Sequence, residues 1–153
     1  MQTRTLEPII AEHPFFSGLA PRYLQLVTGC AKNVRFAEGE FLFREGEKAE
    51  EFYLIREGRA SLGISVPGRG LIPFQTVGAD DVLGWSWLFD PYGWLYHAKA
   101  LEPVRALAFY GICLRGKCEE DHDFGYDFMK RFAGIMTERL QATRLQLLDV
   151  YAV

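Results

Sequence analysis

The sequence predicts an α+β domain that is mainly β: a double-stranded β-roll or jelly roll with N-terminal helices and a long C-terminal dimerisation helix. Three observations predict this fold. Helical patterning occupies residues 1–30, short aromatic and β-branched runs separated by glycines occupy residues 33–110, and a helical segment covers residues 112–151. With 153 residues, the chain has the size of one ordinary domain, so residues 1–153 are expected to form one.

The N-terminal part reads as helix with one break. Gly18 interrupts an apolar stretch that begins at Pro14, and Pro21 then stands where a helix can begin, because proline suits the first helical position. Leu24 and Val27 share one face of this expected helix, which ends near residue 29.

The middle of the chain predicts short antiparallel strands. Six runs of aromatic and branched residues carry the signal: residues 34–36, 41–43, 52–55, 62–66, 71–77 and 104–109. Glycines stand between these runs, and glycine supplies the positive φ that tight hairpins need. The expected turn glycines are Gly39, Gly46, Gly58, Gly68, Gly70 and Gly78. Strands and hairpins at this spacing favour a roll or a small barrel.

The C-terminal segment lacks proline from Asp123 to Tyr151 and carries two apolar stripes. One has heptad spacing and comprises Met129, Ala133, Met136, Leu140, Thr143, Leu147 and Val150. The second comprises Phe124, Phe128, Phe132 and Ile135. The heptad stripe favours a parallel helix pair across a two-fold axis in a homodimer, and the alternative is one wide apolar face of a core helix.

Composition and charge narrow the function classes. The chain has 17 basic and 20 acidic residues, a net charge of −3, which disfavours direct nucleic-acid binding. No apolar run is long enough to span a membrane and none follows Met1 as in a signal peptide, so we expect a cytoplasmic protein. The three histidines, His13, His97 and His122, fall in different parts of the expected fold, and only His97 lies on an expected strand. We therefore expect no metal site, no cofactor, no catalytic residues and no enzyme activity.

Two blocks of sequence support a family resemblance. Residues 36–47 (FAEGEFLFREGE) and 52–60 (FYLIREGRA), followed by residues 82–84 (VLG), resemble the cyclic nucleotide-binding domain of the catabolite activator (Crp/Fnr) superfamily. The resemblance covers essentially the whole chain. Transcription factors of that superfamily continue with a helix-turn-helix domain, whereas only Val153 follows Ala152 here, so the resemblance implies a single-domain form that does not itself bind DNA.

The same resemblance implies an altered phosphate-binding cassette. In the family, a glutamate directly after the cassette glycine binds the ribose and an arginine pairs with the cyclic phosphate. Here Trp85 follows Gly84, and the arginine's place falls at Trp94 or Leu95. Because two charge-assisted contacts are missing, we expect no cAMP or cGMP binding in the usual mode. The candidate ligand-binding residues are Gly84, Trp85, Ser86, Trp94, Leu95, Tyr96, Arg139 and Thr143.

Two functions follow as hypotheses. The first is a regulatory, ligand-sensing domain of signal transduction with a non-standard cassette, a small-molecule ligand of unknown identity and, as a further partner, a regulatory protein. The alternative is a dimeric protein-interaction scaffold whose vestigial pocket is filled by aromatic side chains. The aromatic cluster between Trp85 and Tyr96 fits either hypothesis, since indole rings can line a planar ligand's pocket or fill a core.

Overall fold

The computed structural model describes residues 2–152, with side chains from residue 6 onward. Met1 and Val153, the ends of the expected domain, lie outside the described residues. The chain forms two compact units, residues 1–116 and 117–153, and each is described by itself below.

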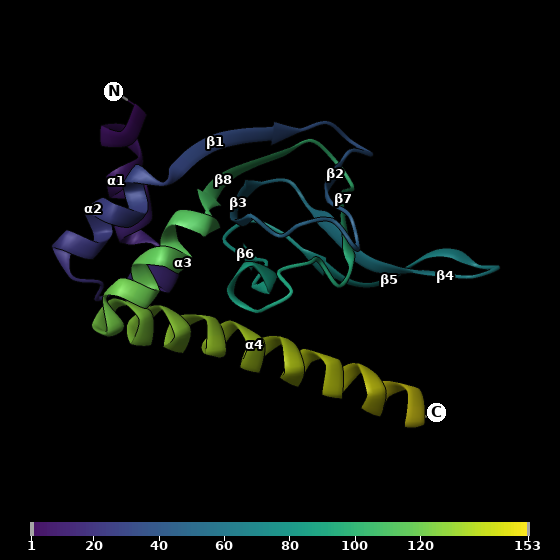
Figure 1. Cartoon of the computed structure of the whole chain (residues 1–153). Coiled ribbons are helices and arrows are strands. Elements are labelled where there is room, and N and C mark those ends of the chain that lie inside the picture. Colours follow the sequence, from purple (N-terminus) through teal and green to yellow (C-terminus); the bar gives the residue numbers. More distant parts are fainter. Residues whose placement is uncertain (1, 153) are drawn as a thin grey trace. The chain divides into compact units, whose positions relative to one another are not determined.

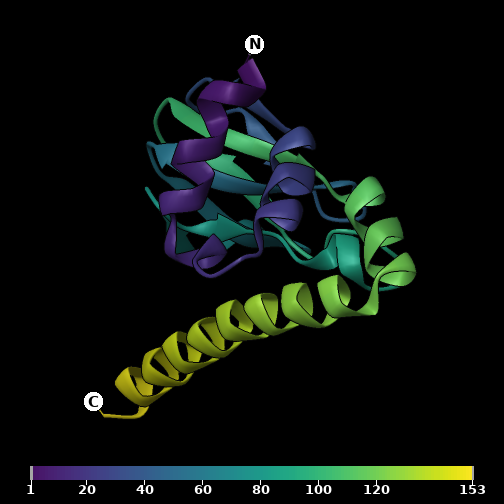
Figure 2. The same cartoon turned by 90° about the vertical axis from the view of Figure 1, so that its left-hand side faces the viewer.

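The first unit begins with the expected helices. They are α1 (Gln2–Glu12), the 3-10 helix η1 (Pro14–Phe16) and α2 (Pro21–Gly29), so the predicted start and end of α2 are confirmed. The imidazole of His13 caps η1 by accepting the backbone N–H of Phe15 at 3.1 Å. Figure 2 shows α1 and α2 side by side across the strands. The Phe16 ring lies 5.4 Å from that of Phe109, which fixes the helices to the sheet.

Among the residues that the structure describes, eight strands form two antiparallel, four-stranded sheets, and the expected mainly β fold is confirmed (Figure 1). In one sheet the order is β1-β8-β3-β6 and in the other β2-β7-β4-β5. Phe43 of the second sheet stacks on Tyr53 of the first, with ring centroids 6.3 Å apart, so the sheets share an apolar interior. The strands are β1 (Ala31–Phe36), β2 (Phe41–Phe43), β3 (Glu51–Glu57), β4 (Ala60–Val66), β5 (Gly70–Val77), β6 (Val82–Leu83), β7 (His97–Ala100) and β8 (Val104–Tyr110).

All six expected strands are present, together with the short strands β6 and β7, and β7 begins at His97, the one histidine that is expected on a strand. β6 has only two residues, and β7 reads HAKA, which alternates polar residues with buried alanines but carries no β-branched or aromatic residue. For one of the six expected turn glycines, Gly78, the prediction of a positive φ was wrong. Gly78 does not adopt a positive φ; Asp80 does, at 72°, because the Asp81 carboxylate accepts the Gly78 N–H at 2.8 Å and shapes this turn.

The expected C-terminal segment is divided into two helices, α3 (Gly111–Glu120) and α4 (His122–Tyr151). Asp121 stands between them as the N-cap of α4, and its carboxylate accepts the backbone N–H groups of Asp123 and Phe124 at 3.1 and 3.2 Å. Asp121 and Asp123 therefore place negative charge at the start of α4, where it meets the positive end of the helix dipole.

At 30 residues, α4 is about 45 Å long and carries its apolar side chains in two different environments. Phe124, Phe128 and Phe132 are buried, and their successive rings lie 4.7 and 6.0 Å apart. The heptad stripe is much more accessible, with Leu140 and Leu147 about half exposed. Between residues 2 and 152, no helix is both long enough and apolar enough to cross a membrane.

Candidate functional site

The segment after β6 is where the sequence predicts the phosphate-binding cassette, and hydrogen bonds to the loop before β3 fix its backbone. Gly84 has a φ of +99°, and Ser86–Leu88 form the 3-10 helix η2. The Trp94 N–H donates to the Glu47 carbonyl at 2.9 Å, and the Gly46 N–H donates to the Trp94 carbonyl at 2.8 Å. With three residues, η2 is too short for a substantial dipole, which argues against an anion site at its start.

Trp94 is a core residue at this site. Its indole stacks on Phe43 with ring centroids 3.7 Å apart and planes 11° apart, and only 4% of the residue is exposed. The indole also lies over Gly84, where an added β-carbon would be 2.6 Å from a ring carbon. Of the two positions that the resemblance gives for the arginine, Trp94 therefore carries a packed aromatic ring, and Leu95 is exposed.

Trp87 and Arg115 fix the other half of the segment. Trp87 is fully buried, and its ring lies 5.2 Å from Phe52. Arg115 of α3 donates from Nη1 to the Trp87 carbonyl at 2.6 Å and places its guanidinium 3.8 Å from the Tyr92 ring centroid. This cation next to the cassette is therefore engaged with a backbone carbonyl and an aromatic face.

The remaining candidates of the first unit differ in accessibility. Ser86 is buried, Trp85 is half-buried, and Leu95 is 71% exposed. Tyr96 is half-buried and contacts Phe43 and Phe74, with centroids 5.6 and 5.7 Å apart.

Phe74 belongs to an apolar face on the hairpin of β4 and β5, which Figure 1 shows extending away from the other strands. Ile64 is the cross-strand partner of Ile72, and Phe74 lies two residues further along β5, at a register shift in the pairing of the two strands. Each is about 40% exposed. An accessible apolar surface therefore adjoins Tyr96.

A pocket of about 340 Å³ opens beside Trp94 and is acidic. Phe43, Tyr53 and Leu42 supply apolar wall, and the charged lining consists of Glu47, Glu50, Glu51 and Lys48. Burial, together with the nearby Glu51 carboxylate, raises the pKa of Tyr53 well above its usual value, so its phenol stays neutral. Three carboxylates against one ammonium give this opening a negative potential, which repels a phosphate.

Arg139 and Thr143 belong to the second unit. The Thr143 hydroxyl donates to the Arg139 backbone carbonyl at 2.9 Å, a hydrogen bond within α4. The two residues are thus brought together by the helix, one turn apart.

Sequence reasoning missed a polar cluster of Ser65, His97 and Glu45. Ser65 Oγ lies 2.9 Å from His97 Nε2, while His97 Nδ1 accepts the Glu45 backbone N–H at 3.2 Å. Because Nδ1 accepts, Nε2 carries the proton of the neutral ring and donates to Ser65. A histidine that activates serine needs the opposite tautomer. No sequence signal pairs these residues, since 32 positions separate Ser65 from His97.

Metal-ligating side chains are dispersed. Within the described part of the chain, no three histidine, cysteine, aspartate or glutamate side chains gather closely enough to hold a metal ion.

Comparison with known proteins gives consistent results. The family model for the cyclic nucleotide-binding domain matches residues 33–121. A "CRP-like cAMP-activated global transcriptional regulator" from Mycobacterium tuberculosis is 24% identical over 145 residues, which cover 95% of this chain and 63% of that protein. This chain thus spans less than two thirds of that curated relative.

Solved structures share the fold. A Geobacter metallireducens GS-15 protein classed with the cyclic nucleotide-binding proteins aligns with a TM-score of 0.78 and 26% identity, over 92% of this chain and 98% of that one. The sensor domain of the transcriptional regulator DNR from Pseudomonas aeruginosa aligns with a TM-score of 0.73 and 17% identity, over 92% and 94% of the two chains.

Proposed function

Because this chain belongs to the cyclic nucleotide-binding domain family, we propose that it is a regulatory, ligand-sensing domain whose altered cassette does not bind cAMP or cGMP in the usual mode. One observation carries the proposal. Trp94 is stacked on Phe43 beside an opening lined by three glutamates and one lysine. A cyclic nucleotide brings a phosphate charge, and this site offers that charge acidic neighbours and a packed indole.

Calorimetry tests the proposal directly. The full chain is titrated with cAMP and with cGMP at low ionic strength, where any electrostatic attraction is strongest. We expect no saturable heat at micromolar ligand. A dissociation constant below about 10 μM for either nucleotide would overturn the proposal.

The ligand class that fits better is planar, apolar and uncharged or cationic. Tyr96 and the face of Ile64, Ile72 and Phe74 offer apolar contact, and the acidic opening favours a positive group. Trp85 and Leu95 are accessible enough to take part. Arg139 and Thr143, one turn apart on α4, are proposed as separate ligand contacts of the second unit.

The domain acts as a homodimer through the heptad stripe of α4 in this proposal. Leu140, Leu147 and Val150 are between 52% and 70% exposed, and Met129 is 40% exposed. Exposed apolar residues at heptad spacing are typical of a helix that pairs with a second copy. The net charge of −3 disfavours direct DNA contact. In this proposal the domain signals in the cytoplasm, through dimer geometry or a partner regulatory protein. The tautomer of His97 supports a role other than catalysis.

A protein-interaction scaffold is the second candidate function. The observation in its favour is that Trp87 and Trp94 are buried core residues, while the nearby apolar surface at Phe74 and Leu95 is exposed. A thermal-shift screen of small metabolites separates the candidates. Stabilisation that rises with the concentration of one compound supports the sensor, whereas silence across the screen together with capture of a specific partner supports the scaffold.

A further inference from the structure

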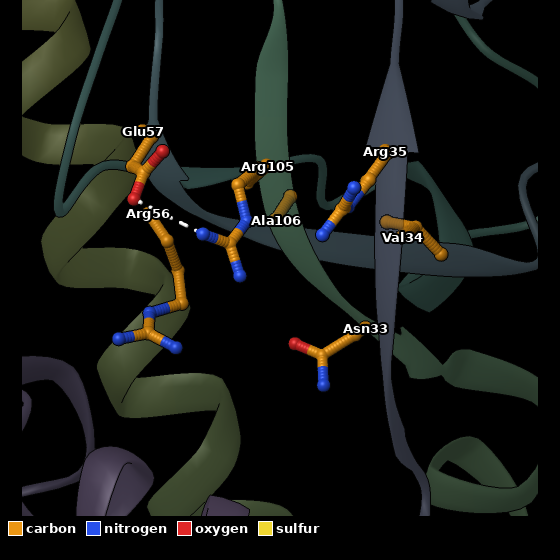
Figure 3. Close-up of a pocket in the computed structure, with 7 residues that line it drawn as sticks. All are labelled: Asn33, Val34, Arg35, Arg56, Glu57, Arg105 and Ala106. Carbon is orange, nitrogen blue, oxygen red and sulfur yellow. Dashed lines mark hydrogen bonds and ion pairs between the residues drawn. The ribbon is translucent and has the colours of Figure 1, made fainter.

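A second pocket, of about 290 Å³, lies on the sheet of β1, β8 and β3, and its charge is opposite to that of the pocket beside Trp94. Its polar lining consists of Asn33, Arg35, Arg56, Glu57 and Arg105. All of these residues lie in the first unit. In Figure 3, Arg105 lies between Arg35 and Arg56, and the three guanidinium groups border the same open space.

Strand register brings the arginines together. Arg35 and Arg105 are partners in the antiparallel pairing of β1 with β8, and like charges directly opposite each other destabilise a sheet. Glu57 is the partner of Arg105 across β3 and β8, and its carboxylate accepts from Arg105 Nη1 at 3.3 Å. One carboxylate therefore faces three guanidinium groups, a formal excess of two positive charges.

The other two arginines are not neutralised by the protein. Among the side chains that the structure describes, neither Arg35 nor Arg56 forms an ion pair. Their guanidinium groups, with the Asn33 amide, offer several N–H donors toward one space. An anion bound there would relieve the repulsion between Arg35 and Arg105.

We propose that this arginine pocket binds the phosphate group of a small soluble molecule, such as a phosphate monoester or a diphosphate. A phosphate carries up to two charges and several acceptor oxygens, which matches the excess charge and the guanidinium donors better than a single carboxylate does. The pocket volume lies at the lower end of the range for small-molecule sites, which suits a compact ligand. The site does not depend on the state of the cassette, because the two pockets share no lining residue.

The test uses inorganic pyrophosphate as the probe and the full chain at low ionic strength. Calorimetry gives the affinity, and amide chemical shifts in NMR spectra locate the site. We expect shifts to concentrate at Asn33, Arg35 and Arg105 and to be absent at Gly84 and Trp94. Shifts centred on the cassette, or saturation absent up to about 10 mM pyrophosphate, would overturn the proposal.

Variants of exposed side chains give the second readout. Arg35→Gln and Arg56→Gln should each weaken binding by roughly tenfold or more, because each removes a charge-assisted contact. Glu57→Gln should tighten it, because it removes the carboxylate that competes for Arg105. Arg59→Gln is the matched control: Arg59 is exposed and paired with Glu102 at 3.2 Å, outside the pocket. Equal weakening by Arg59→Gln would mean unspecific attraction and would contradict the site.

Two further experiments test whether the pocket prefers phosphate to other anions and whether the phosphate belongs to a soluble molecule or to a lipid headgroup. Succinate tests a general anion preference, and we expect it to bind more weakly than pyrophosphate. Vesicles of phosphatidylcholine with phosphatidylglycerol test a lipid headgroup. Sedimentation of the protein with these vesicles, without binding of pyrophosphate, would overturn the proposal of a small soluble ligand.

Discussion

Trp94 lies so close over Gly84 that a β-carbon at residue 84 would be 2.6 Å from the indole. Glycine is required at this position for a second reason as well, because its φ of +99° lies in a region that other residues rarely adopt. The backbone conformation at Gly84 and the buried position of the Trp94 indole therefore depend on each other.

Gly84→Ala should therefore destabilise the fold by about 2 to 4 kcal/mol, since backbone strain and overpacking add. Chemical denaturation measures this loss. Gly46→Ala is the matched control, because Gly46 has a φ of +88° and open space where an added β-carbon would lie. It should cost only about 1 kcal/mol. Equal losses in the two variants would show that contact with Trp94 has no energetic weight.

The stacking of Trp94 on Phe43 should be measurable as a coupling free energy. In a double-mutant cycle of Phe43→Leu and Trp94→Leu, the loss of stability in the double variant should differ from the sum of the two single losses by about 1 kcal/mol, as for other buried aromatic pairs. A cycle of Trp94→Leu with Phe109→Leu serves as the control, because Phe109 packs on Phe16 and Phe52. Additive behaviour in the first cycle would argue against the stacked geometry.

The proposed dimer depends on one face of α4. Leu140→Glu and Leu147→Glu should shift the protein from dimer to monomer in sedimentation velocity, because charge at heptad positions opposes pairing. Leu145→Glu is the control: Leu145 and Leu147 are both 54% exposed, yet two residues correspond to about 200° around the helix. A wild-type protein that is monomeric at high micromolar concentration would contradict the dimer.

The thiol of Cys118 should react slowly with alkylating reagents. Burial first, and then the carboxylates of Glu119 and Asp121, raise its pKa from 9.0 to about 11. Because iodoacetamide attacks the thiolate, labelling of Cys118 at pH 8 should be roughly 100-fold slower in the folded than in the unfolded chain. The rate should climb until about pH 11. Peptide mass spectrometry separates the labelling of Cys118 from that of Cys113, which is exposed and therefore serves as a control for the reactivity of an accessible thiol. A plateau near pH 9 would contradict the raised pKa.

The same shift predicts how stability changes with pH. Because the folded pKa is higher than the unfolded one, the neutral thiol contributes stability that is fully present below about pH 9. That contribution is lost as the pH rises through about 11. Thermal unfolding of the wild type and of Cys118→Ala across this range measures it, and the difference between the two proteins should shrink as the pH rises. A difference that is the same at pH 8 and at pH 11 would argue against this linkage.

Much of the fold follows from local sequence. The Pro21 start and the residue-29 end of α2 are predicted correctly, as is β2, because proline, glycine and aromatic runs act over a few residues. β6 is not predictable, since a strand of two residues has no pattern of its own, and HAKA in β7 gives only a weak signal because alanine is depleted in strands. They form because neighbouring strands offer backbone partners.

The candidate site is only partly visible in the sequence. The cassette's aromatic character can be read from Trp85 to Tyr96, but the packing of Trp94 depends on Phe43, 51 positions earlier in the sequence. Arg35 and Arg105 are 70 positions apart, and neither carries a local signal of a shared pocket. Contacts of this kind arise from strand register, which a single sequence does not reveal.

By itself, the sequence determined the fold class, the family resemblance and the run of aromatic residues between Trp85 and Tyr96, because these depend on residue types and short-range spacing. Only the tertiary structure decided where the charges gather: carboxylates beside Trp94, and arginines on the sheet of β1, β8 and β3. The physical reason is that electrostatic potential depends on distance in space. Strand pairing brings Arg35 and Arg105 opposite each other, although the chain separates them by most of the β-roll.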